Sequence, residues 1–325
     1  MKNKSIDSVK NIHLYDHHQL CNYDEVIWLI GEGRSGTTWI SNLINHDKKY
    51  REMFEPFHPL KIEPMSFLSL HQYIRPNGIN KELENIASDV FSGKFTHQRV
   101  DFNNTSLTSC KKLLIKDIFA NLFAYWASLR FSWLKIILLI RNPFSVALSK
   151  YKKKDWLWLT DPIALLEQKK LYNDYLHPFE NLIRKTCSKN DYILNQVLIW
   201  SIVNYVPLCQ FNQGEIQVIF YEDVYLNPSQ EISKLFNYSN NTSLIIDEKI
   251  IETPSRVPDT ENNITNGISP IISWKNELSI QQIDFGFSIL EAFGFETLYD
   301  NSSMPNKRAL YRMITNNCIS KNSRN

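Results

Sequence analysis

The chain has 325 residues, of which 43% are hydrophobic and 22% are charged, and its formal net charge is +2. This length and hydrophobic content suffice for one large buried core. The small net charge excludes a general attraction to nucleic acid or to a membrane surface, so any basic site must be local. The five cysteines are dispersed without a Cys-x-x-Cys pair, which argues against a metal site or a disulfide framework and favours a reducing compartment.

No long apolar segment lies near either end of the chain. The longest such run, 26–30, is far too short to span a membrane or to form the core of a signal sequence. We therefore expect a cytoplasmic protein without a membrane partner. The polar stretches 1–20 and 303–325 predict frayed ends around a folded core of about 24–300, within one domain that covers 1–325.

The hydrophobic pattern predicts alternating strands and helices. Apolar runs bounded by polar residues predict strands at 26–30, 50–54, 112–116, 135–140 and 216–220. Apolar positions at helical spacing predict helices at 37–45, 119–130, 143–153, 191–210, 229–237 and 279–293. Strands separated by helical stretches imply a parallel sheet with right-handed crossovers. The fold class is therefore α/β, with a central parallel sheet flanked by helices.

Three stretches connect the predicted core elements. Residues 60–110 and 154–190 carry many aromatic residues and prolines, and we expect them to shape a substrate pocket. The Asn-rich stretch 237–266 predicts a long loop that orders over a bound ligand.

The first predicted strand leads into a glycine-rich loop, Gly-Glu-Gly-Arg-Ser-Gly, and a helix then begins at Thr37. This geometry directs successive backbone N–H groups and a helix N-terminus toward a phosphate. The loop amides, three hydroxyl side chains and the helix dipole are suited to hold such an anion. The candidate binding residues of this loop are Gly33, Arg34, Ser35, Gly36, Thr37, Thr38 and Trp39.

Two nucleotide-binding motifs share part of this loop. Its three glycines fit the dinucleotide fingerprint G-x-G-x-x-G, with Glu52 and Glu55 about where a ribose-binding acid lies. The spacing of Gly31 and Gly36 also fits a Walker loop, but Thr37 replaces the Walker lysine and the basic residue, Arg34, lies inside the loop. Phosphoryl transfer without that lysine loses its main source of charge stabilisation.

A second phosphate motif follows the fourth predicted strand. Asn142 is a good N-cap and Pro143 suits the first helical position, so Arg141 leaves the strand beside a helix N-terminus. Ser149 lies about two turns further along that helix. A guanidinium fork and a hydroxyl together suit a phosphate monoester. The alternative is an ordinary strand-to-helix turn with a surface arginine.

Together these motifs resemble those of the sulfotransferases that use 3′-phosphoadenosine 5′-phosphosulfate (PAPS). The loop is similar to their 5′-phosphosulfate loop, and the Arg-to-Ser spacing is similar to their 3′-phosphate motif. The resemblance covers 26–299 and includes Lys116, the turn 221–223, Trp274 and the ending 293–295. In having an arginine in this loop, the chain is similar to the tyrosylprotein sulfotransferases, to some carbohydrate sulfotransferases and to many bacterial members of the family.

The resemblance implies a P-loop-like domain that takes PAPS as cosubstrate, uses no metal and transfers a sulfuryl group to a hydroxyl of a sugar, a natural product or a similar acceptor. It implies that Arg34 stabilises the bridging oxygen, Lys116 helps to hold the sulfonate and Ser255 contacts the leaving phosphate. The residues implied to bind the adenosine end, the first three through the 3′-phosphate and the last near adenine, are Arg141, Ser149, Arg256 and Tyr221.

Glu55 is the predicted general base. It follows the second predicted strand, at the edge where ligands bind in open α/β sheets. Its distance from Arg34 in the sequence resembles that between the loop arginine and the catalytic glutamate of tyrosylprotein sulfotransferases. His58 is the rival base. Where the small-molecule enzymes place a histidine after the lysine strand, this chain has Asp117.

Two other classes of function stay open from sequence alone. One is a nucleotide-dependent kinase or NTPase, which would need magnesium and a Walker-like lysine. The other is a protein that binds a nucleotide without catalysis. The acceptor and the oligomeric state are not readable from the sequence, although four aromatic residues in the second connecting stretch suggest an aromatic wall. These residues are Trp156, Trp158, Tyr172 and Tyr175.

Overall fold

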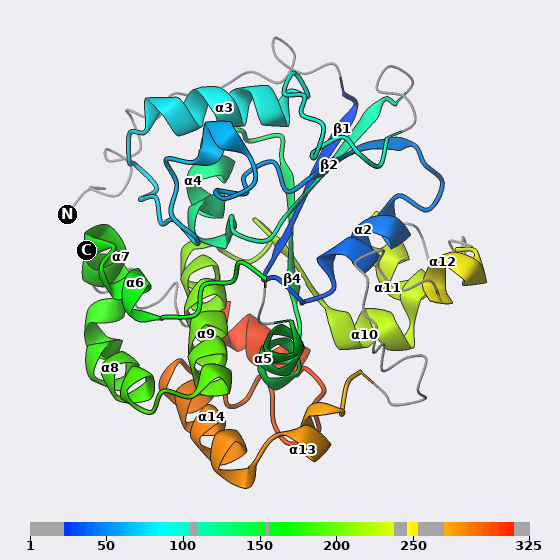
Figure 1. Ribbon diagram of the computed structural model, residues 1–325. Helices are drawn as coiled ribbons and strands as arrows, with labels where there is room; N and C mark the ends of the chain where they lie inside the picture. Colours follow the sequence, from blue (N-terminus) through cyan, green and yellow to red (C-terminus); the bar gives the residue numbers. More distant parts are fainter. Residues whose placement is uncertain (1–22, 105–109, 154–155, 237–245, 253–269, 315–325) are drawn as a thin grey trace, which may run out of the picture.

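A computed structural model describes residues 23–104, 110–153, 156–236, 246–252 and 270–314 of the protein (Figure 1). All five predicted strands form, with ends within one residue of the prediction. They are β1 (Glu25–Gly31), β2 (Tyr50–Phe54), β3 (Lys112–Asp117), β4 (Lys135–Ile140) and β5 (Gln217–Phe220). The strands pair in parallel in the order β2-β3-β1-β4-β5, which confirms the predicted α/β fold class.

Side chains of the sheet alternate between two hydrophobic cores, as the two-residue period of a strand requires. Along β1, Val26, Trp28 and Ile30 face the larger core, whereas Ile27 and Leu29 face the smaller one. Helices flank both faces of the sheet (Figure 1). The larger core is covered by α3 (Lys81–Phe91), α4 (Ala124–Ser128), α5 (Pro143–Lys152), α9 (Tyr192–Gln210) and α14 (Ile280–Ala292). The smaller core is covered by α2 (Thr37–Ile44), α10 (Tyr221–Leu226), α11 (Pro228–Leu235) and α12 (Glu248–Glu252).

Five of the six predicted helices form within two residues of the expected ends. They are α2 (Thr37–Ile44), α5 (Pro143–Lys152), α9 (Tyr192–Gln210), α11 (Pro228–Leu235) and α14 (Ile280–Ala292). Instead of one helix over 119–130, a 3-10 turn (Asn121–Phe123) precedes the short α4 (Ala124–Ser128). By length and composition α9 could cross a membrane, yet 83% of its apolar window is buried within the protein, the environment of a core helix.

The connecting stretches contain helices that we did not predict from the sequence. The longest is α3 (Lys81–Phe91), where the side chain of Asn80 accepts a hydrogen bond from the backbone N–H of Leu83 at 3.1 Å. This cap and the buried positions Leu83, Ala87 and Val90 follow ordinary helical rules, but the many charges between them obscured the period.

The remaining short helices are likewise corrections to the predicted connections. Between 60 and 190 these are η1 (Glu63–Met65), α6 (Ile163–Leu166), α7 (Lys169–Leu171), the π-helix η3 (Tyr172–Leu176), η4 (His177–Phe179) and α8 (Glu180–Ser188). Later in the chain they are α10 (Tyr221–Leu226), α12 (Glu248–Glu252) and α13 (Trp274–Glu277). Of these, α12 lies inside the predicted Asn-rich loop, most of which is outside the described residues.

Candidate functional site

The predicted site residues of the described chain gather at one edge of the sheet. Because the strands are parallel, all their carboxyl ends meet at this edge. Glu55 follows β2, Lys116 belongs to β3 and the glycine-rich loop follows β1 at the centre. Arg141 follows β4 and Tyr221 follows β5, on the other side of the loop. The strand order therefore places Glu55 and Lys116 on one side of the loop and Arg141 and Tyr221 on the other.

Aromatic side chains fix the path of the glycine-rich loop. Gly36 has φ +94°, and a Cβ there would lie 2.5 Å from the ring of Tyr221. At Gly33 a Cβ would lie 2.4 Å from the ring of Trp158. Arg34 also has a positive φ, 71°, which is unusual for a residue with a side chain and indicates local strain. Such strain is characteristic of backbone held for function.

A buried ion pair joins the loop residue Glu32 to helix α5. The ammonium of Lys150, on α5, donates to Glu32 Oε1 and, at 3.0 Å, to Gln196 Oε1. Burial raises the pKa of Glu32, although the charge of Lys150 opposes this rise. The two residues are 118 positions apart in the sequence, and no sequence motif predicted their contact. Breaking a buried pair of this kind by removing one partner is strongly destabilising, about 3–5 kcal/mol.

The two predicted phosphate motifs meet at Arg34. Its Nε donates to Ser149 Oγ at 2.9 Å, and Arg141 Nη1 donates to the carbonyl oxygen of Arg34 at 3.0 Å. The guanidinium of Arg141 also lies 4.2 Å from the centre of the Tyr221 ring, a cation–π distance. The residues predicted for the 5′ and 3′ phosphates thus form one connected unit.

Two polar atoms of this unit lack a partner among the described residues. Ser35 Oγ and Arg141 Nε are both buried and make no hydrogen bond there. Unpaired buried polar atoms are costly, about 1–3 kcal/mol each, unless a ligand or water satisfies them. Donors of this kind beside a helix N-terminus fit an anion.

Glu55 is held by two cations. Lys116 Nζ donates to Glu55 Oε1 at 2.6 Å and Arg99 Nη2 donates to Glu55 Oε2 at 2.5 Å. Glu55 has φ +50°, and its backbone N–H donates to the carbonyl of Lys116 at 2.7 Å. Burial raises the pKa of Glu55, but the charges and hydrogen bonds of Lys116 and Arg99 outweigh it, so the pKa falls below its usual value. Arg99 belongs to no motif and was missed from the sequence.

The rival acids and bases have other partners. The Nδ1 of His58 accepts from the backbone N–H of Leu60 at 3.2 Å, and burial lowers the pKa of His58 to about 4. Both oxygens of Asp117 accept hydrogen bonds, from the Trp28 indole at 2.9 Å and the Phe57 backbone at 3.1 Å. Burial raises the pKa of Asp117 to about 7. These contacts assign Asp117 to the core beneath the site.

The other predicted residues lie as follows. The Trp39 indole donates to the carbonyl of Ile251, on α12, at 3.1 Å, and its ring packs 5.5 Å from that of Tyr221. Glu52, the acid of the dinucleotide interpretation, accepts from Ser41 at 2.7 Å and ties α2 to β2. The predicted residues Ser255 and Arg256 lie outside the described residues.

The four aromatic residues predicted to line a substrate pocket do not form one wall. Trp156 and Trp158 stack at 5.5 Å beside the loop, where Trp156 lies 5.8 Å from the Arg34 guanidinium. Tyr172 instead donates to Glu180 at 2.6 Å, and Tyr175 packs on the ring of Tyr73. The two tryptophans alone are therefore placed against the loop.

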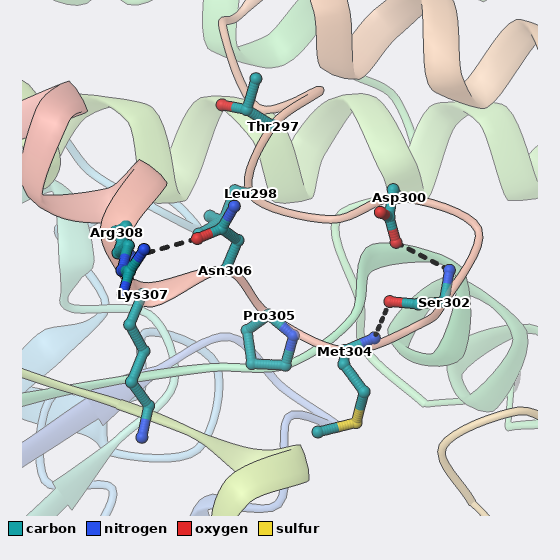
Figure 2. Close-up of a pocket in the computed structure, with 9 residues that line it drawn as sticks. All are labelled: Thr297, Leu298, Asp300, Ser302, Met304, Pro305, Asn306, Lys307 and Arg308. Carbon is teal, nitrogen blue, oxygen red and sulfur yellow. Dashed lines mark hydrogen bonds between the residues drawn. The ribbon is translucent and has the colours of Figure 1, made fainter.

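A separate hollow of about 470 Å³ lies in the C-terminal segment and is lined by Thr297, Leu298, Asp300, Ser302, Met304, Pro305, Asn306, Lys307 and Arg308 (Figure 2). Its polar groups bond to one another, as in the contact of Ser302 N–H with Asp300 at 2.7 Å. The Lys307 ammonium instead pairs with Asp223 at 3.0 Å. No predicted site residue lines this hollow.

Comparison with known proteins gives one family and several similar structures. Residues 24–284 match the family described as the sulfotransferase domain. No curated protein sequence matches the chain significantly. The chain is similar to a sulfotransferase from Alicyclobacillus acidocaldarius (TM-score 0.42, 13% identity, 85% of this chain and 97% of that one). It is also similar to a mouse sulfotransferase complexed with PAP (TM-score 0.42, 13% identity, 96% and 94% coverage).

Proposed function

Because this chain belongs to the sulfotransferase-domain family, we propose that it transfers a sulfuryl group from PAPS to the hydroxyl of a small-molecule or glycan acceptor. Family membership confirms the predicted enzyme class, a sulfotransferase. One observation carries the finer proposal: a carboxylate, a lysine and a connected arginine unit lie along the same edge of the sheet. These are the charges that such a transfer needs at its acceptor and donor ends.

The residues present fit a nucleotide with phosphates at both ends. The loop amides and the orphan hydroxyl of Ser35 would hold the 5′ end, with help from Thr37 and Thr38 at the start of α2. Arg141, whose Nε lacks a partner among the described residues, would take the 3′-phosphate together with Ser149. When bound, PAPS supplies an activated sulfuryl group on a phosphate leaving group. Tyr221 and Trp39 would pack against the adenosine.

Each charged residue then has a role in the in-line transfer. Glu55 accepts the proton of the acceptor hydroxyl, which makes the attacking oxygen more nucleophilic. Its lowered pKa keeps it ionised at neutral pH and therefore ready to accept that proton. Lys116 and Arg34 stabilise the negative charge that spreads over the sulfonate and the bridging oxygen. Electrostatic stabilisation of this type is the largest single contribution in many enzymes.

The acceptor itself is proposed only by its reacting group. An oxygen nucleophile that can approach Glu55 is the requirement, and a sugar or a natural-product hydroxyl meets it. A single domain and a cytoplasmic location, both predicted from the sequence, stay predictions.

The decisive experiment is a screen of hydroxyl acceptors with sulfur-35-labelled PAPS. The formation of 3′-phosphoadenosine 5′-phosphate (PAP), the product left when the sulfuryl group is transferred, is followed in parallel. The proposal expects PAP and a labelled organic sulfate in equal amounts. The Arg34→Ala variant serves as the inactive control, since its loss should impair both cofactor binding and rate. Formation of ADP or a phosphorylated product from ATP, without any transfer from PAPS, would contradict the proposal and favour a kinase.

A further inference from the structure

Arg99 lies on a loop that is fastened to the free edge of β2. The backbone N–H of Phe54 donates to the carbonyl of Val100 at 2.9 Å. The side chain of Asn104 bonds both backbone groups of Glu52, accepting at 2.9 Å and donating at 2.8 Å. The amide of Asn104 thus takes the place of a neighbouring strand. The backbone that carries Arg99 is therefore fixed relative to the strand that ends at the site.

The side chain of Arg99 is directed by three contacts. Its Nη2 donates to Glu55 Oε2 at 2.5 Å, and its Nη1 lies 3.4 Å from the carbonyl oxygen of Phe54. Its guanidinium is 5.1 Å from the centre of the Phe54 ring. The Arg99 side chain is 29% exposed, whereas that of Glu55 is 8% exposed. A partly exposed arginine thus reaches inward to one oxygen of a nearly buried carboxylate.

The charges around this carboxylate do not cancel. Lys116, whose side chain is 2% exposed, bonds the other oxygen of Glu55 and lies 4.1 Å from the Phe54 ring centre. Glu55, Lys116 and Arg99 together carry one net positive charge. His58 and Asp117 also interact electrostatically with Glu55; burial lowers the pKa of His58 to about 4, so that it is neutral at pH 7, and raises the pKa of Asp117 to about 7. Without Arg99, Lys116 and Glu55 would neutralise each other and offer little attraction to an anionic sulfonate.

We infer that Arg99 is a positioning residue for sulfuryl transfer: it fixes one oxygen of Glu55 and balances that charge, so that Lys116 can serve the sulfonate. This inference rests on the proposed function. Lys116 can meet both demands because an ammonium has three N–H donors and its bond to Glu55 uses one. Arg99 acts through Glu55 and needs no contact with either substrate.

The substitutions Arg99→Gln and Arg99→Lys test this role. Removing one of the two charges that hold down the pKa of Glu55 should raise that pKa, which carbon-13 NMR of the glutamate-labelled free protein measures, with Glu55→Gln giving the assignment. The release of labelled sulfate from PAPS, with water as acceptor, should slow by about tenfold or more. Its acid limb should move to higher pH. Arg99→Lys should restore part of the rate, and PAP affinity by calorimetry should stay within about threefold.

Arg75→Gln is the matched control, because it removes a guanidinium from another carboxylate pair, with Asp174 at 2.7 Å. That pair contacts no proposed site residue, so rate and pH profile should be unchanged. Suppose that Glu55→Gln loses activity while Arg99→Gln keeps the wild-type Glu55 pKa and pH profile. Then the role of Arg99 is overturned and the proposed function stands. Near-normal turnover by Glu55→Gln would overturn the role of Arg99 and the assignment of Glu55 as the base, whereas the absence of any transfer from PAPS by the wild-type protein would overturn the proposed function. A loss of PAP affinity in Arg99→Gln with an unchanged pH profile would indicate a merely structural role and also overturn the inference.

Discussion

Arg34 and Ser149 are joined by a hydrogen bond of 2.9 Å although 115 residues separate them in the sequence. The same Arg34 accepts, through its carbonyl oxygen, a hydrogen bond from Arg141. The bond from Arg141 supports the left-handed backbone of Arg34, whose φ is 71°. Hydrogen bonds therefore connect the loop proposed to hold the 5′ end of the nucleotide to the arginine proposed to hold its 3′-phosphate. A substitution at either end should weaken binding at both ends.

Nucleotide affinities should reveal both roles of Arg141. The wild-type protein should bind 3′-phosphoadenosine 5′-phosphate far better than AMP, because Arg141 and Ser149 recognise the 3′-phosphate. Arg141→Ala should abolish this preference and weaken PAP binding by about 10- to 100-fold, the value of a charged hydrogen bond. It should also weaken AMP, since the Arg34 carbonyl loses its donor. Calorimetry with the two nucleotides measures all four affinities.

Lys152→Ala provides the control for this experiment. Lys152 lies on α5, the helix that follows Arg141 and carries Ser149, and pairs with Glu277 at 2.7 Å, so its removal takes away an equal charge outside the proposed site. The PAP-to-AMP ratio should be unchanged in this variant. Equal affinities of the wild-type protein for PAP and AMP would refute the assignment of Arg141 and Ser149.

Alanine substitutions at Gly36 and Gly214 distinguish the stability lost to a positive φ from the PAP affinity lost when a side chain obstructs the glycine-rich loop. Both have a positive φ, of 94° and 90° respectively, but only at Gly36 would a Cβ meet an aromatic ring, whereas nothing lies within 4 Å at Gly214. Both alanine substitutions should cost about 1 kcal/mol in backbone strain. Gly36→Ala should in addition lower PAP affinity by about tenfold or more, and Gly214→Ala should leave it unchanged. Chemical denaturation and calorimetry test this, and equal PAP affinities of the two variants would contradict it.

The strands of the sheet and the positions of the residues at its edge could be predicted from the sequence, because both depend on short, local patterns of residues. Buried parallel strands are continuous apolar runs, so their ends could be placed within one residue, and Lys116 and Arg141 were located by those ends. Arg99 and the pair of Glu32 with Lys150 could not be found in this way, because each depends on a tertiary contact between distant segments. The short helices were not predicted for another reason: packing stabilises them more than their own helix propensity does.

Turnover should not require a divalent metal. Arg34 and Lys116 supply the positive charge that magnesium supplies in phosphoryl transfer. Adding EDTA to the PAPS assay should therefore leave the rate within about twofold. If EDTA abolished activity and magnesium restored it, the protein would have to be assigned to a metal-dependent transfer instead.

Stability in mild acid should depend on His71. Its ring is fully buried against Phe119, at 5.1 Å, and burial lowers the pKa of His71 to about 3. The unfolded chain binds a proton at this histidine near pH 6.5, but the folded protein does not. The contribution of His71 to stability is thus fully present above about pH 6.5 and is lost, at about 1.4 kcal/mol per pH unit, as the pH falls toward 3.

The substitution His71→Asn removes this titration while tolerating the positive φ of 53° at this position. Urea denaturation at several pH values between 4 and 7 should give a shallower loss of unfolding free energy for the variant than for the wild type, whatever their difference at pH 7. Parallel curves for the two proteins would show that His71 does not titrate as its burial requires.

Glu55, the proposed base, should control the rate of transfer more than the affinity for the nucleotide. Glu55→Gln keeps the shape of the carboxylate but cannot accept a proton, so the single-turnover rate with PAPS and a true acceptor should fall by about 100-fold or more. Nucleotide affinity should stay within a few-fold, because Glu55 lies beside Lys116, away from the unit formed by Arg34 and Ser149. Arg34→Ala should instead reduce both the rate and the affinity. His58 is the remaining candidate base, but its Nδ1 already accepts a hydrogen bond from the backbone N–H of Leu60 at 3.2 Å. If Glu55→Gln turned over almost normally and His58→Gln did not, His58 would have to be the base.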